Sequence, residues 1–310
     1  MRRPDRRGFA LIAILWVLLL VSALALDFQT VVQGDRRLAV SARADARGRW
    51  AARAGLARGV AALDELLASD TATVALGSTR FAVLPPLSFE LEGVEGVVTV
   101  VDARSRVHLN LAGPEELTAL FEGIGYSGPD AATLTDQILD WRDADGLRRL
   151  RGAERAEYAA LGPRPGPGNA PFLELEELQR VSAVSPAVYQ RIAPYLTVAG
   201  DGRINLNNAS AAALRTLPGI DGVLAEKIVE MRERAPFQHP FDLLARLPGP
   251  LRRPLQEAFP RFTERAAFGP REVEVVVVAA PAGAPLRSEL RAVATLAGGR
   301  ALSVKRVEER

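Results

Sequence analysis

The chain has 310 residues, of which 48% are hydrophobic and 25% charged, a composition typical of about two folded units rather than of a disordered chain. It contains no cysteine and only two histidines, which excludes disulfides, thiolate metal sites, cysteine nucleophiles and multi-histidine metal clusters. Thirty-nine basic residues against 37 acidic ones leave a net charge of +2, so the chain as a whole has no positive electrostatic field that would attract nucleic acid. The composition also favours a protein that is not an enzyme.

The first predicted element is a membrane-spanning helix. Residues 1–8 contain four arginines and one aspartate, and residues 9–26 follow with Ser22 as the sole polar side chain. As a helix this apolar run spans about 27 Å, close to the roughly 30 Å of a bilayer's hydrocarbon core. Because positive charge stays on the cytoplasmic side, we expect a single-pass anchor with a cytoplasmic N-terminus. A cleaved secretory signal peptide is the alternative, but its small-residue site would fall inside the apolar run.

The junction between the charged leader and the apolar run carries a second feature. Gly8 is followed at once by Phe9, and this junction resembles the cleavage site of the type IV prepilin class. The resemblance implies that a prepilin peptidase cuts between Gly8 and Phe9 and methylates the new amino group of Phe9. Most members of that class carry Glu at the fifth mature position, where this chain has Ala13.

The next predicted elements are a helical extension and a set of short strands. From residue 38 to 67 apolar residues recur at mostly three- and four-residue steps, and we expect this helix to pack on the following domain rather than to form a solvated linker. Runs rich in β-branched residues predict strands at 81–84, 87–92, 94–101, 272–278, 288–296 and 301–307. Residues 108 to 265 have the pattern of helix and loop. The economical architecture is one antiparallel sheet on the N-terminal helix, with a helical domain inserted in it.

The helical insertion contains a duplication. Four blocks recur in the same order: 107–117 with 204–214, 121–124 with 217–220, 138–142 with 228–232, and Pro171-Phe172 with Pro236-Phe237. Ordered recurrence of this kind predicts two related helical units.

Several conspicuous residues of the two units have a structural interpretation. Asn110 and Asn207 stand just ahead of predicted helices, where we expect their side chains to satisfy free backbone amides. Trp141 aligns with Met231 and is expected in the core. His108 and His239 have no catalytic companion in the sequence.

The second unit resembles a helix-hairpin-helix module, which in its DNA-binding form offers the backbone amides of a glycine hairpin to phosphate. A membrane-anchored DNA receptor of the competence type is therefore the main alternative function. Residues 201–249 carry six basic and six acidic residues, and residues 108–200 carry eight arginines against thirteen acids. Since cations supply most of the affinity for phosphate, this balance argues against nucleic acid as a partner, and Asp221 lies in the hairpin itself.

Together these segments resemble the GspK family, the large minor pseudopilins of bacterial type II secretion systems. Besides Gly8–Phe9, Ala13 and the interrupted sheet, the resemblance rests on an ordered series: D-W-R-D-A-D (140–145), G-A-E (152–154) with Tyr158, P-F (171–172) with Glu177-Leu178, P-Y-L-T (194–197) and I-N-L-N-N-A (204–209). It implies an α+β fold in which a pilin-like N-terminal transmembrane helix packs on an antiparallel sheet. A large inserted all-α domain would contain the two helix-hairpin-helix-like repeats.

The resemblance also implies a division of the chain into segments. These are a prepilin leader (1–8), a transmembrane helix (9–26), a helix extension with the first strands of the sheet (27–107), the first repeat of the inserted domain (108–200), the second repeat (201–265) and the returning strands (266–310).

The implied function is that of a non-enzymatic assembly protein of the inner membrane, with most of the chain in the periplasm. It would lie at the tip of the pseudopilus with GspI- and GspJ-like minor pseudopilins, and would initiate or cap the filament that exports proteins across the outer membrane. Ala13 fits a tip subunit, because the glutamate of other pseudopilins is thought to pair with the subunit above, and an unpaired carboxylate in a bilayer is costly. A membrane-tethered scaffold unrelated to secretion is a weaker alternative.

No cofactor is required by this interpretation, but calcium is associated with some members of the family. Asp140, Asp143, Asp145 and Glu154 are hard oxygen ligands in a glycine-containing loop, which suits Ca²⁺, although their spacing departs from the EF-hand pattern. The alternative for these acids is pairing with the arginines of the same loop.

Overall fold

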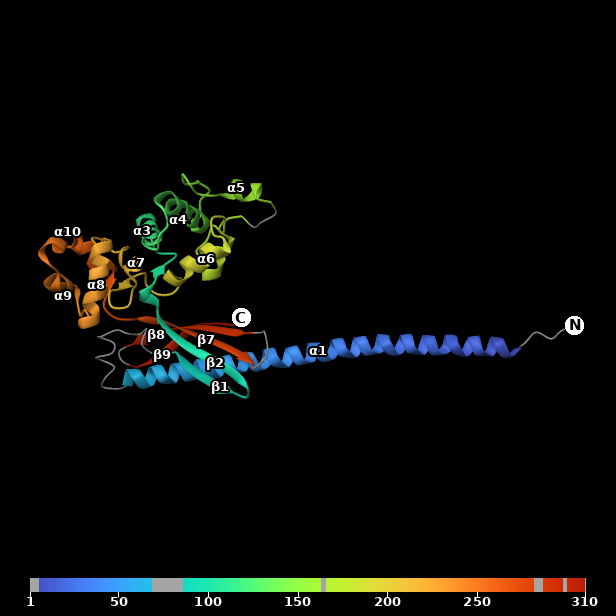
Figure 1. Cartoon of the computed structure of the whole chain (residues 1–310). Helices are drawn as coiled ribbons and strands as arrows, with labels where there is room; N and C mark the ends of the chain where they lie inside the picture. Colours follow the sequence, from blue (N-terminus) through green and yellow to red (C-terminus); the bar gives the residue numbers. More distant parts are fainter. Residues whose placement is uncertain (1–5, 69–85, 163–165, 282–286, 298–299, 310) are drawn as a thin grey trace.

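The computed structural model describes residues 6–68, 86–162, 166–281, 287–297 and 300–309. A single long helix, α1 (Arg6–Ala68), lies along one face of an antiparallel sheet. A helical domain stands on the other side of the sheet, at the end of the molecule away from the N-terminus (Figure 1). The fold class predicted from the sequence is confirmed.

The N-terminal part of α1 has the length and composition of a membrane span. Within the described residues, one helix is long and apolar enough to cross a membrane, and its apolar segment is close to the N-terminus. From Ile14 onward its large apolar side chains are exposed, with Trp16 at 66% and Leu26 at 64%, so no part of the described chain covers them. Residues 1–5 of the predicted leader lie outside the described residues, whereas Gly8 and Phe9 lie in the first turns of α1.

The C-terminal part of α1 packs closely on the sheet because glycines face it. A Cβ on Gly55 would lie 2.5 Å from the ring of Phe89, and one on Gly59 would lie 2.6 Å from Val98. These glycines cost helix propensity, at about 1 kcal/mol each relative to Ala. In return, Ala51, Ala52 and Leu63 of α1 form one buried cluster with the valines of the sheet. The predicted packing of this helix on the following domain is confirmed.

The sheet is a five-stranded antiparallel meander in the order β1-β2-β7-β8-β9. Its strands are β1 (Leu87–Leu91), β2 (Val94–Asp102), β7 (Glu272–Pro281), β8 (Ser288–Ala297) and β9 (Arg300–Glu309). Burial alternates along β2 and β7, with Val98, Val100, Val275 and Val277 facing α1. The strand predicted at 81–84 falls outside the described residues.

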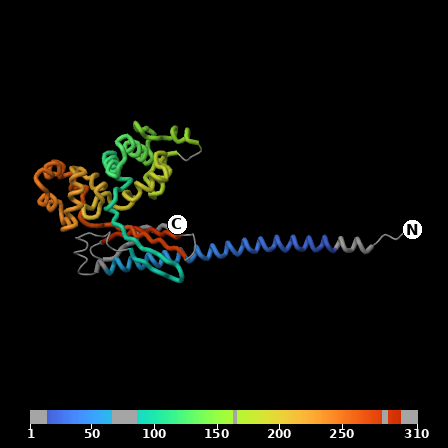
Figure 2. Tube along the Cα trace, viewed as in Figure 1, coloured from blue at the N-terminus to red at the C-terminus, as the bar shows by residue number. Residues whose placement is uncertain are grey.

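The inserted domain leaves the sheet after β2 and returns before β7, where Asp102 pairs with Val273 in the antiparallel register (Figure 2). Its first half contains η2 (Ala103–Ser105), β3 (Val107–His108), α3 (Pro114–Gly123), α4 (Gly128–Arg142), α5 (Arg155–Ala160), η3 (Leu175–Arg180), α6 (Pro186–Ile192), η4 (Ala193–Tyr195) and β4 (Leu196–Thr197). Its second half contains β5 (Ile204–Asn205), α7 (Ala211–Leu214), α8 (Gly222–Arg234), α9 (Pro240–Arg246), α10 (Gly249–Arg265) and β6 (Ala266–Ala267).

Each half is closed by a short parallel bridge between its first and last strands. β3 pairs with β4 in the first half, and β5 pairs with β6 in the second. One continuous core then runs through both halves, from Phe121 and Trp141 to Phe237 and Phe262. Trp141, predicted to be a core residue, is 2% exposed, and its ring stacks on Phe172 and meets Tyr158 edge-on.

Candidate functional site

The two repeats are held by the same asparagine clamp. The Asn110 side chain donates to the carbonyl of Phe172 (2.8 Å) and accepts from the amide of Phe172 (2.9 Å). Asn207 makes the equivalent pair of bonds with Phe237, both 2.8 Å long, and also donates to the carbonyl of Phe268 (3.0 Å). The prediction that these asparagines satisfy free helix amides is therefore wrong. Each one instead ties the start of its repeat to the Pro-Phe segment far along the chain.

A second duplicated contact comes from the arginine near the end of the second helix of each repeat. Arg232 donates through Nη1 to the carbonyls of Leu206 (3.0 Å) and Ala209 (2.5 Å). Arg142 donates to the aligned carbonyls of Leu109 and Ala112. Partial burial lowers the pKa of both guanidinium groups. These contacts give the sequence duplication a physical basis.

The hairpin glycines of both repeats are packed against other helices. A Cβ on Gly123 would meet the backbone of Ala212 in α7 at 3.1 Å. Gly219, with φ of +79°, comes so close to α10 that a Cβ would lie 2.9 Å from the carbonyl oxygen of Pro254. Asp221 accepts from the amide of Leu224 and caps α8. The first hairpin thus rests on the second repeat and the second hairpin on α10, an arrangement that favours packing over phosphate binding.

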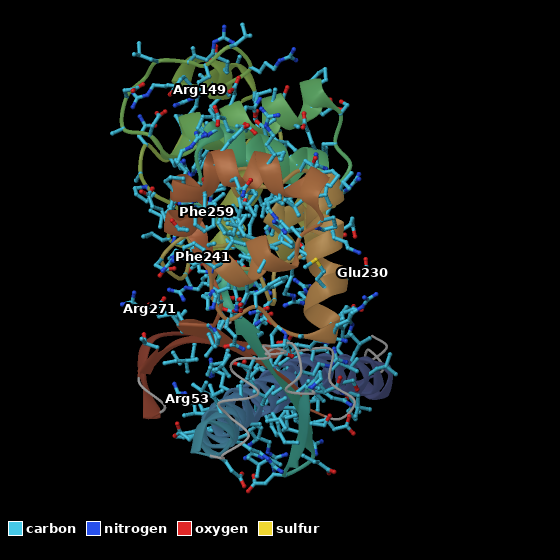
Figure 3. The ribbon with its side chains drawn as sticks, turned by 90° about the vertical axis from the view of Figure 1, so that its left-hand side faces the viewer. Arg53, Arg149, Glu230, Phe241, Phe259 and Arg271 are labelled. Carbon is cyan, nitrogen blue, oxygen red and sulfur yellow. The ribbon has the colours of Figure 1, made fainter. Side chains whose placement is uncertain are left out.

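The acidic loop at the far end of the inserted domain brings three of the four predicted ligands together. Carboxylate oxygens of Asp143, Asp145 and Glu154 lie within 4.8 Å of one another. Asp140, fully buried at the end of α4, accepts instead from the guanidinium (2.7 Å) and the amide (3.2 Å) of Arg149. Arg149 also pairs with Asp143 at 2.5 Å. Figure 3 shows Arg149 at the end of the molecule opposite the sheet.

The polar atoms of this loop fit a hard cation. One oxygen of Asp143 and one of Glu154 are buried and have no hydrogen-bond partner among the described residues. Burial raises the pKa of Glu154, and the charges of Asp140, Asp143 and Asp145 raise it further. A divalent cation would supply the missing partner for both oxygens and would compensate the like charges. Asp143, Asp145 and Glu154 are thus a candidate calcium centre.

A third polar cluster joins the inserted domain to the sheet and was not predicted. Asp102, 2% exposed at the end of β2, accepts from the side chains of Asn205 (2.8 Å) and Asn208 (3.1 Å) of the second repeat. Arg104 donates to Asp201 at 3.1 and 2.5 Å and to the carbonyl of Gly269 at 3.0 Å. Burial raises the pKa of Asp102, although each of these donors opposes the shift.

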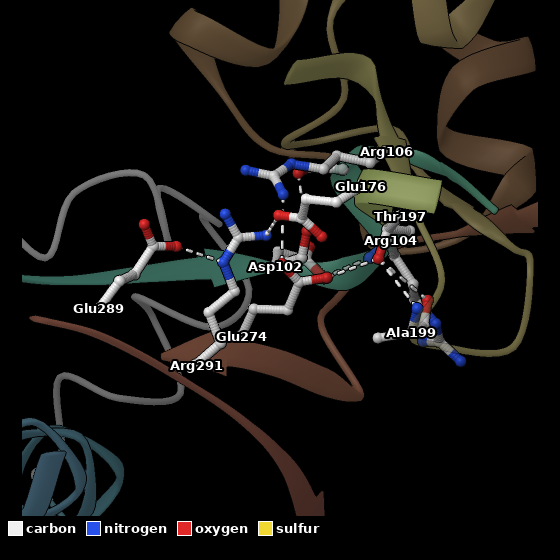
Figure 4. Close-up of polar contacts among 10 residues, drawn as sticks. Asp102, Arg104, Arg106, Glu176, Thr197, Ala199, Glu274, Glu289 and Arg291 are labelled. Atoms are coloured by element: carbon white, nitrogen blue, oxygen red, sulfur yellow. Dashed lines mark hydrogen bonds and ion pairs between the residues drawn. The ribbon is translucent and has the colours of Figure 1, made fainter. Parts of the chain in front are cut away.

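The first repeat reaches the sheet through ion pairs shown in Figure 4. Glu274 of β7 accepts from Arg106 (3.2 Å) and from the hydroxyl of Thr197 (2.5 Å). Arg291 of β8 pairs with Glu176 of η3 at 3.3 Å. No motif marks these residues. The sequence feature that could have predicted Glu274 is the alternation Glu272-Val-Glu274-Val, because it places both acids on the sheet face opposite α1.

The predicted processing residues lie at the other end of the molecule. Gly8, Phe9 and Ala13 are in the first turns of α1, far from the sheet and the inserted domain (Figure 1). Their side chains lie outside the described residues, so cleavage and methylation stay predictions.

Known proteins share both the fold and the sequence blocks. Residues 98–201 match the family model described as Type II secretion system (T2SS), protein K, and residues 200–247 match a helix-hairpin-helix motif. A chain of the crystal structure of the GspK-GspI-GspJ complex from enterotoxigenic Escherichia coli superposes with a TM-score of 0.66 at 16% identity, covering 87% of this chain and 98% of that one. At this identity the likeness shows the fold alone, an α+β fold in which a long N-terminal helix packs on an antiparallel sheet with an inserted helical domain.

Three curated relatives carry the name Type II secretion system protein K. The protein from Pseudomonas aeruginosa is 30% identical over 53% of this chain and 52% of its own length. Those from Klebsiella pneumoniae (30% identity, 38% and 40%) and Aeromonas hydrophila (31% identity, 43% of each) match shorter stretches. The chain thus spans about half, or less, of the length of these relatives. The resemblance to the GspK family is confirmed as a similarity: the chain is similar to the type II secretion K proteins over these stretches.

Proposed function

We propose that this protein is a minor pseudopilin at the tip of a type II secretion pseudopilus, where it joins GspI- and GspJ-like subunits and initiates or caps the filament. The observation that carries the proposal is the position of the inserted domain. It stands at the end of the molecule away from the apolar part of α1, across the sheet from the C-terminal half of that helix (Figure 1). A bulky domain at that end favours a terminal subunit, because it occupies the space that the next subunit of a filament would need.

The proposed location is the inner membrane, with the N-terminus in the cytoplasm and the sheet and inserted domain in the periplasm. The exposed apolar part of α1 and the arginines that precede it support this orientation.

The proposed role is not enzymatic, and both histidines make local contacts. The Nδ1 atom of His108 accepts from the amide of Asn110, and that of His239 accepts from the amide of Asp242 at the start of α9.

The experiment that tests the proposal is mass spectrometry of the N-terminus, on protein purified from its native membrane. Prepilin processing gives a chain that begins at N-methylated Phe9, and a Gly8→Val variant, with a branched side chain at the cut, retains residues 1–8. Co-purification of the mature chain with the small minor pseudopilins of the same system is the second step. A wild-type chain that keeps residues 1–8 would rule out the pseudopilin assignment, and DNA binding measured against salt would then be tested next.

We further propose that calcium binds at Asp143, Asp145 and Glu154 and stabilises the loop that they share. Calcium at a hundred times its dissociation constant would add about 2.7 kcal/mol to the free energy of unfolding. We expect the thermal midpoint to rise on adding calcium and to fall again with a chelator. A Glu154→Gln variant would lose this response, whereas Glu122→Gln, on the exposed surface of α3, would keep it. An equal response in both variants would place the calcium elsewhere.

A further inference from the structure

The part of α1 beyond the membrane carries an unusual concentration of positive charge. Residues 36–61 contain seven arginines and a single acid, Asp45, which pairs with Arg49 at 3.1 Å. All seven arginines are exposed. The segment therefore has a net charge of +6, whereas the whole chain has a net charge of only +2.

The side chains on the face of α1 turned away from the sheet follow a regular spacing. Ala51, Ala52 and Gly55 are buried against the sheet. On the opposite face, residues alternate at three- and four-residue steps. We call them the cationic stripe: Arg36, Ala39, Arg43, Ala46, Trp50, Arg53 and Ala57. A repeat of 3.5 residues is the spacing of a helix that packs along a second helix, and the alanines allow the two backbones to approach closely.

The middle of the cationic stripe contains a large aromatic residue in an exposed position. Trp50 is 68% exposed, and the guanidinium carbon of Arg53 lies 5.4 Å from the centre of its ring. An exposed tryptophan beside arginines is typical of the anchors of protein interfaces, where both residue types are enriched.

Distance decides between a lipid surface and a protein as the occupant. Trp50 is 24 residues beyond Leu26, the last residue of the apolar run, which corresponds to about 36 Å along a helix. Attraction to anionic headgroups falls off within a Debye length, about 8 Å at physiological ionic strength. The centre of the cationic stripe is thus out of reach of the membrane, and a protein helix is the occupant that fits its spacing.

We propose that the cationic stripe is the docking surface for an acidic helix of another subunit. Carboxylates of that helix would pair with Arg43 and Arg53, its small or apolar residues would lie against the alanines, and one apolar side chain would cover Trp50. This inference rests on the proposed function, because it names the chemistry by which this subunit recognises its neighbours.

The test uses the full chain, co-expressed in membranes with the GspI- and GspJ-like subunits of the same system and purified in detergent. The variant is Arg43→Glu with Arg53→Glu, which reverses two exposed charges and leaves the face buried on the sheet intact. The matched control is Arg253→Glu with Arg261→Glu, which reverses two exposed arginines on α10. We expect the amount of partner that co-purifies with the variant to be about tenfold lower than with wild type, which corresponds to a loss of about 1.4 kcal/mol of binding free energy. The control should retain the wild-type amount.

Two further measurements separate the possible failures. In wild type, the retained partner should decrease as salt is raised, and replacing acids of the partner helix by lysine should restore binding to the variant. If wild type and the variant bind the same amount of partner, the cationic stripe is not the docking surface, and the pseudopilin assignment is unaffected. Absence of partners from the wild-type preparation would overturn the assignment itself, and the docking proposal with it.

Discussion

Replacing the two clamp asparagines by alanine, one at a time, tests whether the repeats are equivalent in energy as well as in sequence. Asn207→Ala removes three hydrogen bonds from a side chain that is 5% exposed. Asn110→Ala removes two from a half-buried side chain. At about 1 kcal/mol for each bond, the losses are about 3 and about 2 kcal/mol. The difference of about 1 kcal/mol corresponds to a roughly fivefold change in the ratio of folded to unfolded protein.

The assay is urea unfolding of the full chain in detergent, followed by tryptophan fluorescence. Trp141 is a suitable reporter because its ring stacks on Phe172, the residue that Asn110 holds. Equal losses in the two variants, or a larger loss for Asn110→Ala, would refute the counting of bonds. Losses below about 0.5 kcal/mol in both would show that the clamps contribute little to stability.

Three other predictions concern the inserted domain and its junction with the sheet. Gly219→Ala should destabilise the protein by about 1–3 kcal/mol, because it puts a Cβ at positive φ against α10. In the same urea assay Gly222→Ala, where a Cβ meets nothing within 4 Å, should be neutral or stabilising, and equal effects would contradict the packing argument. Burial lowers the pKa of His108 from its ordinary 6.5, so the unfolded chain gains a proton first and the free energy of unfolding should fall as pH drops below 6.5. A His108→Gln variant should lack this slope, and an identical pH profile would exclude His108 as its source. Asp102→Ala leaves the side-chain amides of Asn205 and Asn208 without their acceptor and should loosen the domain junction. Relative to wild type, hydrogen exchange in the variant should become faster in β5 and stay unchanged in β1.

Features of the chain that depend on local pattern were predicted correctly. The apolar run, the valine-rich strands and the repeated blocks each depend on composition or spacing within a short window, and each is present in the structure. Even the aligned arginines Arg142 and Arg232 were identified as equivalent, although their shared contacts with backbone carbonyls were not foreseen.

Features that depend on distant contacts were missed. The Asn110 clamp reaches a residue 62 positions away, and the bond from Asn205 to Asp102 spans 103 positions, so no window of sequence contains both partners. The Asp140 carboxylate is a local case: it was grouped with the other loop acids as an oxygen ligand for calcium, and pairing with the arginines of the same loop was the stated alternative. Because Asp140 lies on the buried face of α4, its carboxylate points inward, where it pairs with Arg149. Pro254 and Pro260 would ordinarily interrupt a helix, yet α10 runs through both.

The register of β2 and β7 has a consequence for the origin of this architecture. Asp102 faces Val273 in an unbroken antiparallel ladder, so the whole inserted domain occupies the place of one hairpin turn. The parallel bridges β3–β4 and β5–β6 close each half of the insertion on itself, so the ends of the domain are already together when they reach the sheet. The inserted domain therefore does not disturb the pairing of β2 with β7. A chain in which a short turn replaces residues 103–271 should therefore keep every strand pairing of the five-stranded sheet, so the sheet and the inserted domain are separable units of this architecture.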